Sequence, residues 1–155
     1  MPPALWPAPA KDHLLPSRLA GRCLASVIGC MPKPAGPILV VDDDTNSRAF
    51  LARLLQSEGY VVAEAGDGEE GLALAREWRP CVILLDLMMP IMDGFAFLEA
   101  QSRSPEIADI PVIVISAIAD RAQVARRLGP IQSATKPIDF KVLLGQVAHC
   151  CDCRK

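Results

Sequence analysis

The sequence has no long hydrophobic run. Its apolar stretches, such as Cys81–Leu85, cover only a few residues, whereas a helix that spans a bilayer needs about 20. We therefore expect no transmembrane segment and a cytoplasmic protein. Charged residues are also scarce, at 22%, against 51% hydrophobic residues. This balance is typical of a packed globule and argues against disorder over most of the chain.

Basic residues are too few to favour a nucleic-acid partner. Residues 1–37 carry a net charge of +3, and residues 38–155 carry −5. Because nucleic-acid binding depends on cationic side chains that contact phosphates, the acidic part of the chain predicts no nucleic-acid binding.

A framework of spaced cysteine pairs is also missing. Of six cysteines, Cys81 lies in an apolar run, and Cys150, Cys151 and Cys153 fall within the last six residues. This distribution does not predict stapling disulfides, so we expect reduced thiols in a C-terminal tail over residues 150–155. Zinc is an alternative for this cluster, but closed zinc sites usually take ligand pairs from separated segments.

The first 36 residues differ from the rest. Eight of the fourteen prolines precede residue 38, and no hydrophobic period there is long enough to bury a face. We expect residues 1–36 to form a disordered or linker tail. The rest of the chain is long enough for one domain, which we expect over residues 37–149.

From Ile38 onward, predicted strands and helices alternate. Short apolar runs that suit buried parallel strands cover Ile38–Val41, Val82–Leu85 and Ile110–Ile115, with weaker strands at Val61–Ala65 and Ile131–Ala134. Helical periods lie between them, and the clearest, after residue 138, contains Phe140, Leu143, Leu144 and Val147. Five such units predict an α/β fold, a doubly wound five-stranded parallel sheet.

Polar residues follow the predicted strands. Asp42, Asp43 and Asp44 follow the first, Asp86 the third, Ser116 the fourth, and Thr135-Lys136-Pro137 the fifth. In an open parallel sheet, the ligand site lies beyond the carboxyl ends of the strands. We therefore expect these side chains to converge.

Such a set of side chains is suited to phosphoryl transfer. Clustered carboxylates repel one another unless a cation joins them, and Mg²⁺ prefers oxygen ligands. Asp86 can act as the nucleophile, while Lys136 and the Ser116 hydroxyl take up charge on the transferred group. Taken singly, each of these polar residues has a structural explanation, since acids after a strand often cap the next helix. We expect one residue of Asp44, Thr45 and Asn46 to cap the helix that follows. The occurrence of all these polar residues at successive strand ends favours the functional explanation.

Three blocks of this sequence resemble the signature motifs of response-regulator receiver domains. They are Ile38–Asp44, Leu84–Gly94 and Thr135–Pro137. The resemblance implies a flavodoxin-like fold with strand order 2-1-3-4-5, phosphorylation of Asp86, and Mg²⁺ held by Asp42, Asp43, Asp86 and the Met88 carbonyl. It also implies that Ser116 and Lys136 bind the phosphoryl oxygens, and that the bond before Pro137 is cis.

The same resemblance implies a role in two-component signalling. A sensor histidine kinase or a histidine phosphotransfer protein would supply the phosphoryl group, and the chain would be a phospho-acceptor that assists its own phosphorylation and dephosphorylation, not an enzyme. With about six residues after the last predicted helix, we expect it to act on a downstream protein target, as a monomer or a weak phosphorylation-linked dimer. Ser133 departs from the family, which often has Tyr or Phe at this position.

Two alternatives remain beside this interpretation. A pseudo-receiver would keep the fold as a protein-binding module without the chemistry. A haloacid-dehalogenase-like phosphatase would use the Asp-x-Asp within Asp42–Asp44, but Asn46 replaces the usual Thr or Val, and no second acidic pair follows Lys136.

Overall fold

The computed structural model describes residues 36–116, 118–129 and 131–152. These residues belong to the second of two units in the chain, Pro32–Lys155. The expected N-terminal tail, apart from Gly36, lies outside the described residues, as do residues 153–155. Within the described part, no helix combines the length and hydropathy that crossing a membrane requires.

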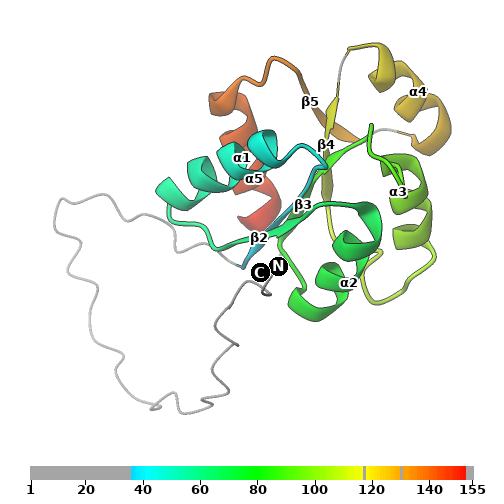
Figure 1. Cartoon of the computed structure of the whole chain (residues 1–155), viewed down its shortest axis with the longest axis horizontal. Helices are drawn as coiled ribbons and strands as arrows, with labels where there is room; N and C mark the ends of the chain where they lie inside the picture. Colours follow the sequence, from blue (N-terminus) through cyan, green and yellow to red (C-terminus); the bar gives the residue numbers. More distant parts are fainter. Residues whose placement is uncertain (1–35, 117, 130, 153–155) are drawn as a thin grey trace, which may run out of the picture. The chain divides into compact units, whose positions relative to one another are not determined.

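Five strands alternate with five helices along the described chain (Figure 1). The strands are β1 Ile38–Val41, β2 Val62–Ala65, β3 Val82–Asp86, β4 Val112–Ser116 and β5 Gln132–Thr135. The helices are α1 Thr45–Ser57, α2 Gly68–Trp78, α3 Gly94–Ser102, α4 Ile118–Leu128 and α5 Phe140–Asp152. All strand pairs are parallel, in the order β2-β1-β3-β4-β5. The predicted fold is confirmed, with most strand boundaries moved by one or two residues.

Alternate residues of the central strands enter two different cores. In β1, Ile38 and Val40 pack with α1 and α5, whereas Leu39 and Val41 pack with α2, α3 and α4. Helices therefore cover both faces of the sheet, and its central strands are apolar on both sides. Phe97 of α3 is among the largest fully buried side chains.

Aspartates start four of the helices. Asp44, Asp67 and Asp93 are the N-caps of α1, α2 and α3, and each side chain accepts a hydrogen bond from a backbone N–H of the first turn. At the fourth, α5, the Asp139 side chain accepts from the amides of Lys141 and Val142. Of the three candidates for the cap of α1, the structure selects Asp44. This aspartate is therefore occupied by the helix and not by the cluster beside it.

The expected C-terminal tail of reduced thiols is wrong where the structure describes it. Helix α5 continues to Asp152, Cys150 and Cys151 are buried, and Cys151 forms a disulfide with Cys81, with Cα atoms 5.0 Å apart. The fold brings the start of β3 next to the end of α5, across 70 residues of sequence. Cysteine spacing along the chain carries no sign of this contact. Residue 153, the remaining member of the cluster, lies outside the described residues.

Candidate functional site

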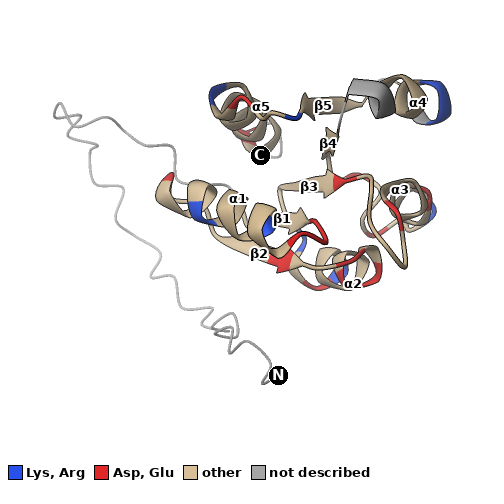
Figure 2. Ribbon diagram, turned by 45° about the horizontal axis from the view of Figure 1, so that its top comes forward, with Lys and Arg blue, Asp and Glu red and all other residues tan. Residues whose placement is uncertain are grey.

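The register of the sheet brings the predicted site residues to one edge. Val41 lies opposite Leu85, Asp86 opposite Ile115, and Ser116 opposite Thr135. The residues that end or follow β1, β3, β4 and β5 are therefore neighbours in space. Figure 2 shows acidic segments at the ends of β1 and β3, and a basic segment directly after β5.

Three carboxylates form a cluster. One oxygen from each of Asp42, Asp43 and Asp86 lies within 4.8 Å of the others. Asp42 is 2% exposed and Asp86 is 7% exposed, whereas Asp43 is exposed to solvent. Burial raises the pKa of Asp42 above its ordinary value, and a 2.8 Å hydrogen bond from the Asp44 amide opposes this shift. Repulsion by Asp86 and Asp43 raises the pKa of Asp42 further.

The cluster fits a hard divalent cation. All its ligand atoms are carboxylate oxygens, which Mg²⁺ and Ca²⁺ prefer, and Asp43 is exposed to solvent, which can supply water ligands. A cation would also relieve the mutual repulsion of the carboxylates. Met88 follows closely: its amide donates to Asp86 Oδ1 at 3.2 Å, while its side chain is 68% exposed.

Lys136 lies on the other side of Asp86. Its Nζ is 3.4 Å from Asp86 Oδ2, and its amide donates to the Ser116 carbonyl at 3.1 Å. Ser116 is 2% exposed, and the Lys136–Pro137 bond is cis, as the resemblance implied. The two oxygens of Asp86 thus contact different groups, a backbone amide and an ammonium. The structure brings the predicted carboxylates and Lys136 together and places Ser116 at the same edge of the sheet. The metal-binding and phosphoryl-binding roles of these residues and of the Met88 carbonyl stay predictions.

Arg48 of α1 also lies next to the acidic cluster, and the sequence-based prediction of the site did not include it. Its Nη1 donates to the Asp42 carbonyl at 2.7 Å, and its Nε is 3.5 Å from Glu64 Oε2 on β2. A sequence signal existed, because Arg48 comes four residues after the N-cap Asp44. Helical side chains point back toward the N-terminus, so a long cationic side chain in this turn reaches the end of β1.

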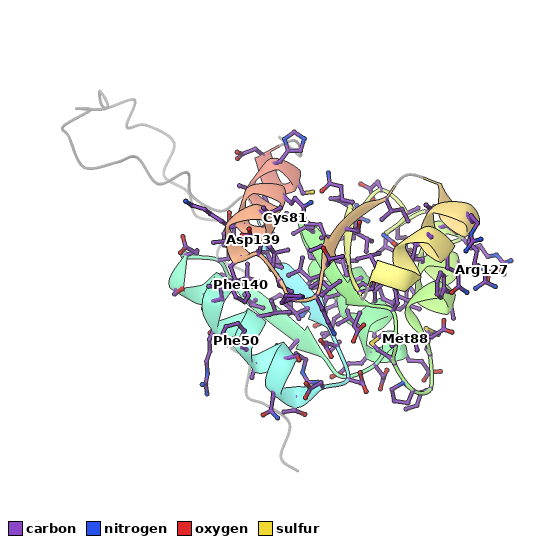
Figure 3. The ribbon with its side chains drawn as sticks, turned by 90° about the horizontal axis from the view of Figure 1, so that it is seen from above. Phe50, Cys81, Met88, Arg127, Asp139 and Phe140 are labelled. Carbon is purple, nitrogen blue, oxygen red and sulfur yellow. A yellow bond between two sulfur atoms is a disulfide. The ribbon has the colours of Figure 1, made fainter. Side chains whose placement is uncertain are left out.

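A groove adjoins the cluster. Its volume is about 260 Å³, and its lining includes Asp42 and Lys136 together with Phe50, Ile138 and Phe140. The Phe50 and Phe140 rings meet edge to face, with centroids 5.2 Å apart. Figure 3 shows these two side chains side by side, from α1 and the start of α5. The edge of the sheet that carries the cluster is therefore flanked by an apolar surface.

The fold and this arrangement match a known family. The response regulator receiver domain aligns with residues 38–148. This chain belongs to the response regulator receiver domain family.

Relatives in the family differ in how much of their own length matches this chain. RpaA of Synechocystis sp., a DNA-binding dual master transcriptional regulator, is 36% identical over 71% of this chain and 46% of its own length. Protein PilH of Pseudomonas aeruginosa is 34% identical over 69% of this chain and 90% of its own length. Thus the chain spans under half of the first relative and most of the second.

Solved structures show the same fold. The signal receiver domain of a signal transduction histidine kinase from Syntrophus aciditrophicus aligns with a TM-score of 0.70 and 30% identity, over 77% of this chain and 92% of that one. Family membership makes this chain a receiver domain of two-component signalling and argues against the phosphatase alternative. It leaves the pseudo-receiver alternative to a chemical test.

Proposed function

We propose that this receiver accepts a phosphoryl group on Asp86 in a Mg²⁺-dependent reaction. One observation carries the proposal: the carboxylate of Asp86 lies between an acidic pair, Asp42 and Asp43, and an ammonium, Lys136. A buried carboxylate with a cation on one side and further acids on the other has the surroundings of a nucleophile that takes up a charged group.

Each residue has a distinct task in this proposal. An oxygen of Asp86 attacks phosphorus, and the bond from phosphorus to the donor's nitrogen breaks, with the electron pair leaving on that nitrogen. Asp42, Asp43, Asp86 and the Met88 carbonyl would hold Mg²⁺, which supplies charge neutralisation to the phosphoryl oxygens. Lys136 and the Ser116 hydroxyl would each bind one further phosphoryl oxygen.

The proposed donor is a sensor histidine kinase or a histidine phosphotransfer protein. The groove beside Asp42 and Lys136, with Phe50 and Phe140, offers apolar area next to the reactive carboxylate. Phe50 is 54% exposed, and so is Val142 further along α5. We propose that the phosphorylated chain then acts on a downstream protein target, in the cytoplasm, without binding nucleic acid, as a monomer or a weak phosphorylation-linked dimer.

The test is phosphorylation by a small donor. With Mg²⁺ and acetyl phosphate, the wild-type protein should gain one phosphoryl group by intact mass, and Asp86→Asn should gain none. Asp93→Asn is the matched control, since Asp93 is exposed, caps α3, and can be replaced by Asn, which is an equally good cap. Equal labelling of wild type and Asp86→Asn would contradict the assignment. No labelling of wild type would favour the pseudo-receiver.

A further inference from the structure

The amide, the carbonyl and one carboxylate oxygen of Asp42 each have a different hydrogen-bond partner. Its amide donates to the Ala65 carbonyl of β2 at 3.2 Å, and its carboxylate accepts from the Asp44 amide at 2.8 Å. Its carbonyl accepts from Arg48 Nη1 at 2.7 Å. Only the last partner is a long side chain from a helix, so the orientation of this peptide group depends on Arg48.

That peptide group leads directly to Asp43. The carbonyl of Asp42 and the amide of Asp43 lie in one plane, because the peptide bond is planar. Fixing the direction of the carbonyl therefore fixes the direction in which the chain leaves Asp42. Asp43 is exposed and contributes one of the three clustered oxygens, so the peptide plane before it is one of the determinants of where that oxygen lies.

Glu64 holds Arg48 in this role. The Arg48 side chain is 17% exposed, and its Nε lies 3.5 Å from Oε2 of the half-exposed Glu64 side chain of β2. Two groups on one guanidinium, the Asp42 carbonyl just after β1 and the Glu64 carboxylate on β2, use its planar fork of donors. The ion pair also turns the positive charge of Arg48, in the first turn of α1, toward β2.

We propose that Arg48 is a positioning residue for the metal pair: through the Asp42 carbonyl it sets the place of the Asp43 carboxylate, and Glu64 holds it there. This rests on the proposed Mg²⁺-dependent function. Charge and position make opposite predictions here. As a mere nearby cation, Arg48 repels Mg²⁺, and its removal strengthens Mg²⁺ binding. As a positioning residue, it strengthens Mg²⁺ binding, and its removal weakens it.

Calorimetric titration of the full chain with Mg²⁺ decides between these effects. We expect Arg48→Met to raise the Kd for Mg²⁺ about tenfold, the size seen when groups that orient metal ligands are lost. Arg48→Lys, which keeps the charge but has one nitrogen for two partners, should weaken binding as well and provides a conservative variant if Arg48→Met folds poorly. Arg53→Met, an exposed position on the same helix, should leave the Kd unchanged.

A second measurement needs no metal. In the metal-free protein, the backbone amide signal of Asp43 should shift in Arg48→Lys and stay in place in Arg53→Lys. Unchanged or tighter Mg²⁺ binding by both Arg48 variants, with an unmoved Asp43 amide, would overturn the proposal and leave the proposed function intact. If wild type itself binds no Mg²⁺, the proposed function fails first, and this inference fails with it.

Discussion

At the scale of single residues, Ile91 is a strained residue without a packing reason. It has a φ of 69° and is 81% exposed, in the loop that joins β3 to α3. A β-branched side chain crowds the backbone in the left-handed region, at a cost of about 1–2 kcal/mol. The side chain recovers little of this by burial. Strain of this kind near the proposed phospho-acceptor Asp86 favours a loop kept for contact with other molecules.

Replacing Ile91 by Asn should stabilise the protein. Asn tolerates the left-handed region, so we expect about 1 kcal/mol of added stability, which raises the Tm by about 4 °C for a domain between the small and large size classes. Thermal unfolding measures the change. Ile91→Thr is the control, because Thr is polar but still β-branched. A similar gain in Ile91→Thr would mean that exposure, not backbone strain, is the cause.

Asp42 makes the metal-free protein sensitive to pH. Its pKa is raised in the fold above the ordinary value of 3.8, first by burial and then by repulsion from Asp86 and Asp43. The folded state therefore binds the proton more tightly than the unfolded chain. The stability that this proton contributes is present below pH 3.8 and is lost as the pH rises through the raised pKa.

Asp42→Asn should remove the loss of stability that wild type shows as the pH rises through the raised pKa of Asp42. In chelator-treated protein near pH 7, we expect the variant to be at least as stable as wild type in urea unfolding, with a smaller decline between acid and neutral pH. Mg²⁺ should stabilise wild type more than the variant, since binding to the folded state adds to its stability. A variant clearly less stable than wild type without Mg²⁺ would refute the prediction.

At the scale of elements, strand β5 and helix α4 leave space between them. A cavity of about 320 Å³ there is lined by Val114, Val124, Ile131 and Ser133, among others. Ser133 is small, so its side chain leaves this space unfilled at the position where the family resemblance led us to expect a Tyr or Phe ring. Phosphorylation can shift a two-state element only through contacts that differ between its states.

We expect the response to phosphorylation to be larger at the start of α4 than in β5. Backbone amide shifts with and without beryllofluoride, a phosphoryl mimic, measure it. In Ser133→Phe, the ring can enter the cavity and stabilise the protein by up to about 1.5–3 kcal/mol, the value for full burial, and β5 should then respond more strongly. Equally large shifts in both elements of wild type would show that β5 responds without a ring.

The elements were predictable because their signals are local. Buried runs such as Val82–Leu85 and the helical period at Phe140–Val147 each depend on neighbours in sequence, and parallel strands place Asp42, Asp86 and Lys136 at one edge without further information. Contacts between distant elements have no such signal. The donation from Arg48 to a backbone carbonyl, and the bridge from Cys81 to Cys151, depend on how helices lie on the sheet.

At the scale of the whole domain, one covalent bond joins the first half of the fold to its end. The Cys81–Cys151 bridge closes a loop with a sequence separation of 70 residues. The loop contains Asp86, Ser116 and Lys136, while the bridge itself lies at the other end of β3 from Asp86. Figure 3 shows Cys81 beside α5. Cys150, next to the bridge, is buried and donates from Sγ to Gln132 Oε1 at 3.2 Å.

Opening this bridge should destabilise the domain as a whole. A loop of this length restricts the unfolded chain enough to contribute about 4 kcal/mol, so Cys151→Ser should lower the unfolding free energy by up to that amount in urea under non-reducing conditions. Wild type treated with a phosphine reductant should show a similar loss. Cys81→Ser and Cys151→Ser each break the same bond. The double variant should therefore lose little more unfolding free energy than either single variant. Two results would contradict this prediction. One is a double variant whose loss equals the sum of the two single losses. The other is a wild type whose stability does not change with reductant and whose peptide map shows Cys81 and Cys151 unlinked; either result would mean that the two thiols stabilise the fold by packing and not by a bond.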